Sequence, residues 1–186
     1  MQRPLNRALA VAAALALAAA GTVQAQVGLT SNTATVTLNA TKTSTLTVTP
    51  STGTTTLASI TDNSNANVFP NVGLTTAWNL TAGTSVNLIG WFTTPASALA
   101  NGAAVIPSSN VEGGINGGGW TAFTGAAVGG VGVAGGSLQL FNQAVAAVNY
   151  FANRTDQLNL RLNLVGFPTT SAGTYTGTLN VQAVVQ

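Results

Sequence analysis

Gln157-Leu158-Asn159-Leu160-Arg161-Leu162-Asn163-Leu164 alternates polar and apolar side chains without a break. Successive side chains of a β-strand point to opposite faces, so the four leucines of this segment would share one face. A helix would scatter the same leucines around its circumference. Each buried leucine contributes about 1.5–3 kcal/mol relative to an exposed one, which specifies the register of the strand. The segment therefore predicts a strand with one face in an apolar core.

The same period of two recurs on both sides of this segment. It predicts strands at residues 33–40, 45–49, 77–80, 85–92 and 174–185. A hairpin is predicted at residues 111–123, because Asn116-Gly117 readily adopts the positive φ angles of a type I′ turn. The glycine-rich residues 125–136 are expected to form a loop or a distorted edge strand. With eight or nine strands and no helical pattern after Ala25, the chain is predicted to be all-β, an antiparallel β-sandwich.

The first 25 residues are predicted to be a helical signal peptide. Arg3 and Arg7 precede an unbroken apolar run at residues 8–20, and Val23-Gln24-Ala25 supplies small residues at the positions that signal peptidase recognises. We expect cleavage between Ala25 and Gln26, leaving residues 26–186 as one β-sandwich domain in the periplasm, on the cell surface or outside the cell. An uncleaved anchor helix is the alternative, but the apolar run is shorter than the roughly 20 residues of a membrane span. No integral membrane segment is expected after signal removal.

Without the signal peptide, the protein is predicted to be nearly neutral. The remaining chain has three cations, Lys42, Arg154 and Arg161, and three carboxylates, so its net charge is close to zero. Nucleic-acid binding requires clustered lysine and arginine side chains that displace counterions from phosphates. Scattered cations do not provide such a cluster, so nucleic acid is not an expected partner.

The sequence is poor in the groups on which most catalysis and metal binding depend. It contains no histidine and no cysteine, and its only carboxylates are Asp62, Glu112 and Asp156, far apart along the chain. Glycosidase chemistry needs two carboxyl groups about 5–10 Å apart, and no spacing here predicts such a pair. We therefore predict a non-enzymatic protein with no catalytic, cofactor-binding or metal site. Arg154 and Asp156 are predicted to form a local surface ion pair.

Two stretches match the residue pattern of a binding motif but lack the structural context or the ligands that the motif requires. Residues 130–135 fit the glycine pattern of a dinucleotide site, but that site needs a strand before it and a helix after it, and residues 137–141 are predicted to be a strand. Residues 62–67 are rich in oxygen ligands, as calcium loops are, but offer a single carboxylate. We interpret them as an Asx-rich surface turn.

The three tryptophans leave a second function open. Trp78 is expected in the core, whereas Trp91 and Trp120 are equally compatible with burial and with exposure. Exposed aromatic rings stack on sugars, and the surrounding asparagine and threonine side chains can bind hydroxyl groups. A carbohydrate-binding module with Trp91 or Trp120 as its platform is therefore the alternative function.

Residues 171–181, Ser171-Ala172-Gly173-Thr174-Tyr175-Thr176-Gly177-Thr178-Leu179-Asn180-Val181, resemble the closing strand of secreted bacterial surface proteins of the fimbrial-pilin and spore-coat-U-like kind. The resemblance implies an immunoglobulin-like sandwich that assembles by donating a strand to a neighbouring subunit, either a copy of itself or another surface β-sandwich protein. The implied donor is the alternating segment Ala34, Val36, Leu38 and Ala40, or this segment extended to Val48, because its apolar side chains can fill pockets along an open sheet edge. The chain departs from such pilins in lacking a disulfide and an aromatic C-terminal ending. The resemblance thus implies a structural or adhesive subunit of the cell surface.

Overall fold

The computed structural model describes residues 33–186. The predicted signal peptide, with its cleavage site at Ala25 and Gln26, lies outside the described residues. The chain divides into two units, Met1–Thr41 and Lys42–Gln186. The described part of the first unit, residues 33–41, is exposed and forms no strand. The prediction of a strand at residues 33–40 was therefore wrong, although apolar and polar side chains do alternate there.

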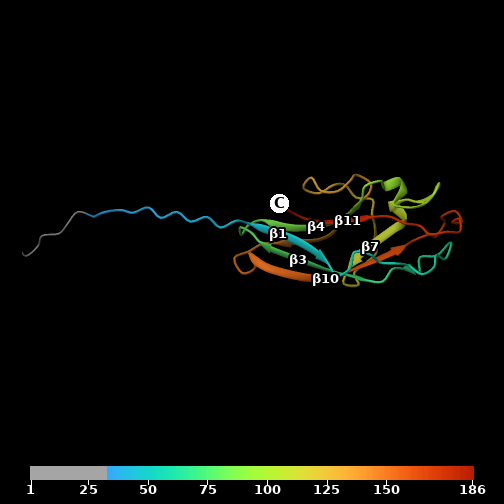
Figure 1. The fold of residues 1–186 in the computed structure, drawn as a ribbon, viewed down its shortest axis with the longest axis horizontal. Coiled ribbons are helices and arrows are strands. Elements are labelled where there is room, and N and C mark those ends of the chain that lie inside the picture. The colour runs from blue at the N-terminus through green and yellow to red at the C-terminus, as the bar shows by residue number, and fades with distance from the viewer. Residues whose placement is uncertain (1–32) are drawn as a thin grey trace, which may run out of the picture. The chain divides into compact units, whose positions relative to one another are not determined.

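The second unit contains a six-stranded antiparallel sheet (Figure 1). Five of its strands follow one another in the order β1-β3-β10-β7-β8, and β2 pairs with the C-terminal end of β10. The longest of them is β10, which pairs with β3 along one side and with β7 along the other. The bounds are β1 (Thr45–Pro50), β2 (Asn67–Val68), β3 (Val72–Asn79), β7 (Val111–Ile115), β8 (Thr121–Ala122) and β10 (Phe151–Leu162).

A three-stranded antiparallel sheet forms the other layer, in the order β11-β4-β9. Its strands are β4 (Ser85–Phe92), β9 (Ser137–Ala144) and β11 (Leu179–Val185). A small hairpin of β5 (Leu99–Asn101) and β6 (Ala104–Ile106) is flanked by two single-turn 3₁₀ helices, η1 (Pro95–Ser97) and η2 (Ser108–Asn110). Within residues 33–186 no helix is long and apolar enough to cross a membrane. The described chain is thus all-β, with antiparallel sheets, as predicted.

The two sheets share one apolar core. The alternation in β10 places its leucines inward: Leu158 is 3%, Leu160 8% and Leu162 0% exposed, and Leu164 just beyond the strand is 1% exposed. From the opposite layer, β4 contributes Val86, Leu88 and Phe92, which belong to the same core cluster. Trp78, predicted to be a core residue, is buried in this cluster and donates a hydrogen bond from its indole nitrogen to the carbonyl of Asn149. The inward faces of both layers therefore follow from the period of two.

Phe123 fills the space that two glycines leave between the layers. Its ring is fully buried and packs edge-on against Phe92 with 5.2 Å between ring centroids. A Cβ atom at Gly113 in β7 would lie 2.9 Å from this ring, and one at Gly90 in β4 would lie 3.1 Å from it. A side chain at Gly113 would therefore displace the buried ring, and one at Gly90 would fit only if the ring moved by a few tenths of an ångström.

The hairpin predicted at residues 111–123 is confirmed. Asn116 and Gly117 have φ angles of 55° and 70°, and the amide of Gly118 donates a hydrogen bond to the carbonyl of Ile115. These are the features of the type I′ turn that the Asn-Gly pair predicts. The glycine-rich segment 125–136 forms a loop, and Gly129 in this loop approaches the side chain of Val184 on the outer face of β11.

The ion pair between Arg154 and Asp156 forms as predicted, but it does not lie on the surface. Asp156 is only 2% exposed, and its carboxylate lies 2.7 Å from the Arg154 guanidinium. The strand extends back to Phe151, so Arg154 and Asp156 have the same parity as Leu158 and share its inward face. The predicted final strand likewise differs at one end, because β11 begins at Leu179 rather than at residue 174.

Candidate functional site

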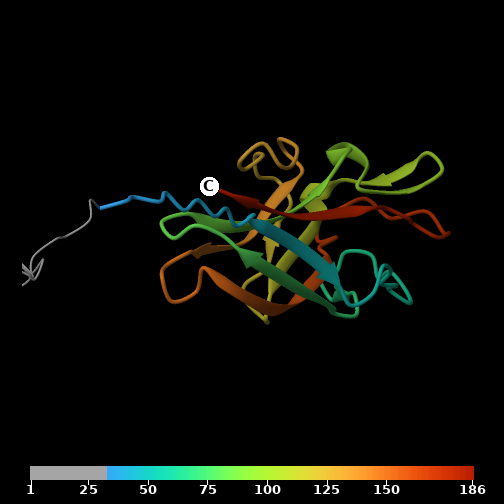
Figure 2. The same cartoon turned by 60° about the vertical axis from the view of Figure 1, so that its left-hand side comes forward.

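β1 and β11 are edge strands of different sheets. β1 pairs only with β3, and β11 pairs only with β4. Each therefore presents a row of backbone N–H and C=O groups that have no partner in its own sheet. The two strands lie next to each other without pairing, and the C-terminal end of β11 lies near the start of β1 (Figure 2). The two edges thus form an open side of the sandwich-like body.

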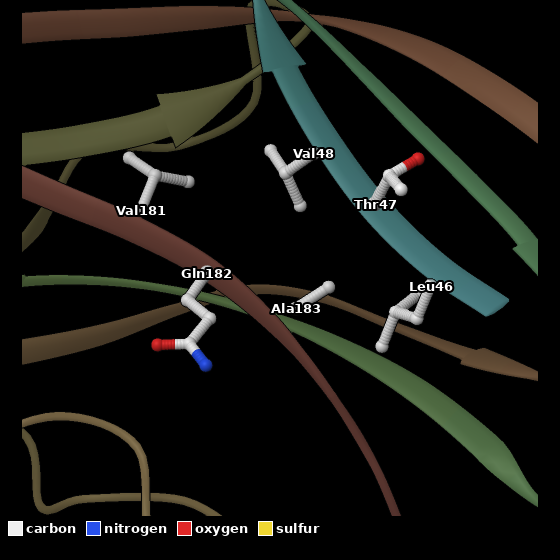
Figure 3. A pocket seen from close by; sticks show the side chains of 6 residues that line it. All are labelled: Leu46, Thr47, Val48, Val181, Gln182 and Ala183. Atoms are coloured by element: carbon white, nitrogen blue, oxygen red, sulfur yellow. The ribbon is translucent and has the colours of Figure 1, made fainter.

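A hollow of about 220 Å³ lies between these two edges (Figure 3). Leu46 and Val48 project from β1 toward β11, while Thr47 points to the other side of the strand. From β11, Val181 and Ala183 line the hollow, together with Gln182. The side chains of Leu46, Val48 and Val181 are half-buried and pack against the main core. The hollow is therefore lined both by apolar side chains and by polar groups of the two strands, and it is open to the outside.

The predicted donor segment has the matching pattern. Val36 and Leu38 are 77% and 89% exposed. Ala34 and Ala40 continue the same alternation on either side of them. Seven residues in extended conformation span about 23 Å, close to the length of β11 with its seven residues. An alternating apolar segment and an open hollow between two edge strands thus occur in one sequence.

The two tryptophans that the sequence left open lie on opposite sheets. Trp91 is half-buried on β4, on the face opposite to Leu88 and Phe92, and it is not part of the core cluster. Trp120 is 36% exposed and precedes β8, where its ring lies 4.7 Å from the guanidinium carbon of Arg161. Trp120 is therefore the more accessible of the two candidate sugar platforms.

The three carboxylates do not form a catalytic pair or a metal site. Glu112 pairs with Arg161 on the outer face of the six-stranded sheet, and Asp156 lies on the inner face five positions from Arg161, about 16 Å along the strand. Asp62 lies in a loop and bonds to Thr170. Within residues 33–186 no group of three histidine, cysteine, aspartate or glutamate side chains is arranged to hold a metal ion.

The carboxylate of Asp62 is held by hydrogen bonds from Thr170, and their effect on its pKa can be measured by pH titration. Its carboxylate accepts hydrogen bonds from the amide and the hydroxyl of Thr170 at 3.0 and 2.7 Å, and these bonds lower the pKa of Asp62 below its ordinary value of 3.8. Because the folded pKa is lower than the unfolded one, the stabilisation is present above the unfolded value and is lost as pH falls through the folded value. Thr170→Val should raise the pKa of Asp62, measured by NMR titration of its carboxyl carbon. A wild-type pKa at or above 3.8 would contradict this assignment.

Comparison of the chain with protein-family models, with curated proteins and with solved structures finds no match.

Proposed function

We propose that this protein is an exported, non-enzymatic structural or adhesive subunit of the cell surface, which assembles by strand exchange between copies. The single observation that carries the proposal is the exposure of Val36 and Leu38 at 77% and 89% in a chain whose body has an open hollow between two edge strands. Large exposed apolar side chains at every second position are an aggregation hazard unless a partner covers them. The donor of one copy inserted into the hollow of another covers both apolar surfaces at once.

Two further features support this proposal. The predicted signal peptide accounts for export, and the scattered carboxylates offer no constellation for turnover. The two antiparallel layers with a shared core are compatible with the immunoglobulin-like sandwich that the closing-strand resemblance implies. In this fold, a donated strand would pair its backbone with β1, with β11 or with both.

The direct test is the assembly state of the exported protein. Size-exclusion chromatography with light scattering should detect species larger than a monomer, and negative-stain electron microscopy should show their form. Intact mass spectrometry should find a chain that begins at Gln26. A protein that stays monomeric at all concentrations and occurs only free in the periplasm would refute the proposed assembly.

A further inference from the structure

The outer face of the six-stranded sheet carries mainly polar side chains, most of them uncharged. The residues of β10 that point away from the core are Phe151, Asn153, Thr155, Gln157, Asn159 and Arg161, and each is exposed or half-buried. In the neighbouring strands, Thr75 pairs in register with both Thr155 and Thr49. From Asn153 to Arg161 this row runs about 26 Å along the strand.

Trp120 lies at one end of this row and packs on the side chain of Arg161, which is held in place by hydrogen bonds. The Arg161 guanidinium lies 4.7 Å from the ring centroid, a cation–π distance. Arg161 donates from Nε to Oε2 of Glu112 at 2.6 Å, and Asn163 donates to Oε1 of the same carboxylate at 2.8 Å. The side chains of Arg161 and Glu112 are 18% and 13% exposed, so this network is partly protected from water. The ring is therefore held against a hydrogen-bonded network whose two charges cancel.

The turn before Trp120 leaves the ring accessible. Residues 117–119 are all glycine, and a Cβ atom at Gly117 or Gly119 would have no heavy atom within 4 Å. Side chains from this turn therefore cannot cover the indole. An aromatic ring that packs on a guanidinium and is 36% exposed is a rigid surface on which a flat apolar group can stack.

From this geometry we infer that Trp120 and the outer face of β10 bind a neutral polysaccharide. The apolar face of a sugar ring stacks on the indole, and its hydroxyl groups bond to the amides and hydroxyls that follow along β10. The charge beside Trp120 disfavours an acidic glycan there, because Arg161 is already paired with Glu112. This face is distinct from the hollow between β1 and β11, so sugar binding on it does not depend on strand exchange.

The test is a binding screen with the full exported protein. The probes are an array of neutral and acidic oligosaccharides, and pull-down with insoluble cellulose, chitin, mannan and β-glucan. We expect binding to at least one neutral glycan, and an affinity about tenfold lower for Trp120→Ala, as one lost stacking contact implies. Gln157→Ala tests the polar row and should weaken binding by a smaller factor. The matched control is Tyr150→Ala, which removes another exposed aromatic ring, 47% exposed, from outside the platform and should bind like the wild type.

Each outcome of this screen bears on the inference. Circular dichroism of each variant separates loss of binding from loss of fold, and Gln157→Ala carries the test if Trp120→Ala does not fold. Absence of binding to every neutral glycan would overturn the inference, as would binding confined to acidic glycans. Equal affinities of the wild type, Trp120→Ala and Gln157→Ala would place the ligand elsewhere on the protein.

Discussion

Replacing Val36 and Leu38 together by aspartate should abolish assembly of this protein. Both side chains lie on the apolar face of the donor segment, and strand exchange would place them in the hollow beside Val48 and Ala183. A carboxylate moved from water into an apolar site without a partner loses several kcal/mol, more than the insertion of a short strand can compensate. Light scattering after size-exclusion chromatography should therefore show only monomers of the variant.

The chain offers a closely matched control for this experiment. Thr35→Asp with Thr37→Asp adds the same charge to the same segment, but on the face that would point away from the hollow. This variant should still assemble. If both double variants assemble as the wild type does, strand exchange through residues 34–40 is wrong. If both fail, charge repulsion rather than burial of one face governs assembly.

Engineered disulfides can identify the two surfaces directly, because the protein has no cysteine of its own. Leu38→Cys in one copy and Val48→Cys in a differently tagged copy should cross-link after the two are refolded together. Thr47→Cys, which points away from the hollow, should not. A cross-link within a single chain carrying both cysteines, without one between chains, would show that the donor folds back onto its own body.

The direction of the donated strand decides which assembly results. β1 and β11 run in opposite directions, so a strand between them is parallel to one and antiparallel to the other. A donor antiparallel to β1 leaves the hollow at the end where β1 begins, so two copies can exchange strands in a closed pair. A donor parallel to β1 leaves at the opposite end, which produces an open chain of subunits. Electron microscopy distinguishes pairs from fibres.

The sequence was sufficient for those features that depend on neighbouring residues. The period of two identified the inward faces of β4 and β10, and the Asn116-Gly117 pair identified its turn. It was not sufficient for pairings between distant strands. The contact of Trp120 with Arg161 arises because β7 pairs with β10, which places Glu112 opposite a residue 49 positions away. No local pattern encodes that choice of partner.

The position of Asp156 shows how a correct pattern can be applied over too short a range. A strand that begins at residue 157 leaves Arg154 and Asp156 in a surface loop, where charged side chains are common. Extending the same alternation backward places both on the leucine face, as the structure does. The sequence signal for burial was that Asp156 has the same parity in the strand as Leu158. Only the charge of Asp156 indicated a surface position.

Asp156→Ala should destabilise the fold strongly. The Asp156 carboxylate accepts two hydrogen bonds from Arg154, at 2.7 Å each, and a third from Asn116 at 2.7 Å. Without it, the half-buried guanidinium remains against the ring of Phe141, 4.0 Å from its centroid, with no counter-charge. Loss of one partner of a buried pair lowers the free energy of unfolding by about 3 kcal/mol. Urea unfolding followed by tryptophan fluorescence measures this change.

Two further variants separate the buried charge from the loss of any carboxylate. Asp62→Ala removes the same charge from an exposed loop and should have a much smaller effect. Arg154→Met with Asp156→Leu replaces the pair by apolar side chains on the inward face, and should recover most of the stability, because the desolvation penalty of both charges disappears together. The buried pair would have no special role if Asp156→Ala destabilised the protein no more than Asp62→Ala. If the double variant is less stable than Asp156→Ala, the pair stabilises the core through its hydrogen bonds. In that case two apolar side chains do not replace the free energy that these hydrogen bonds contribute.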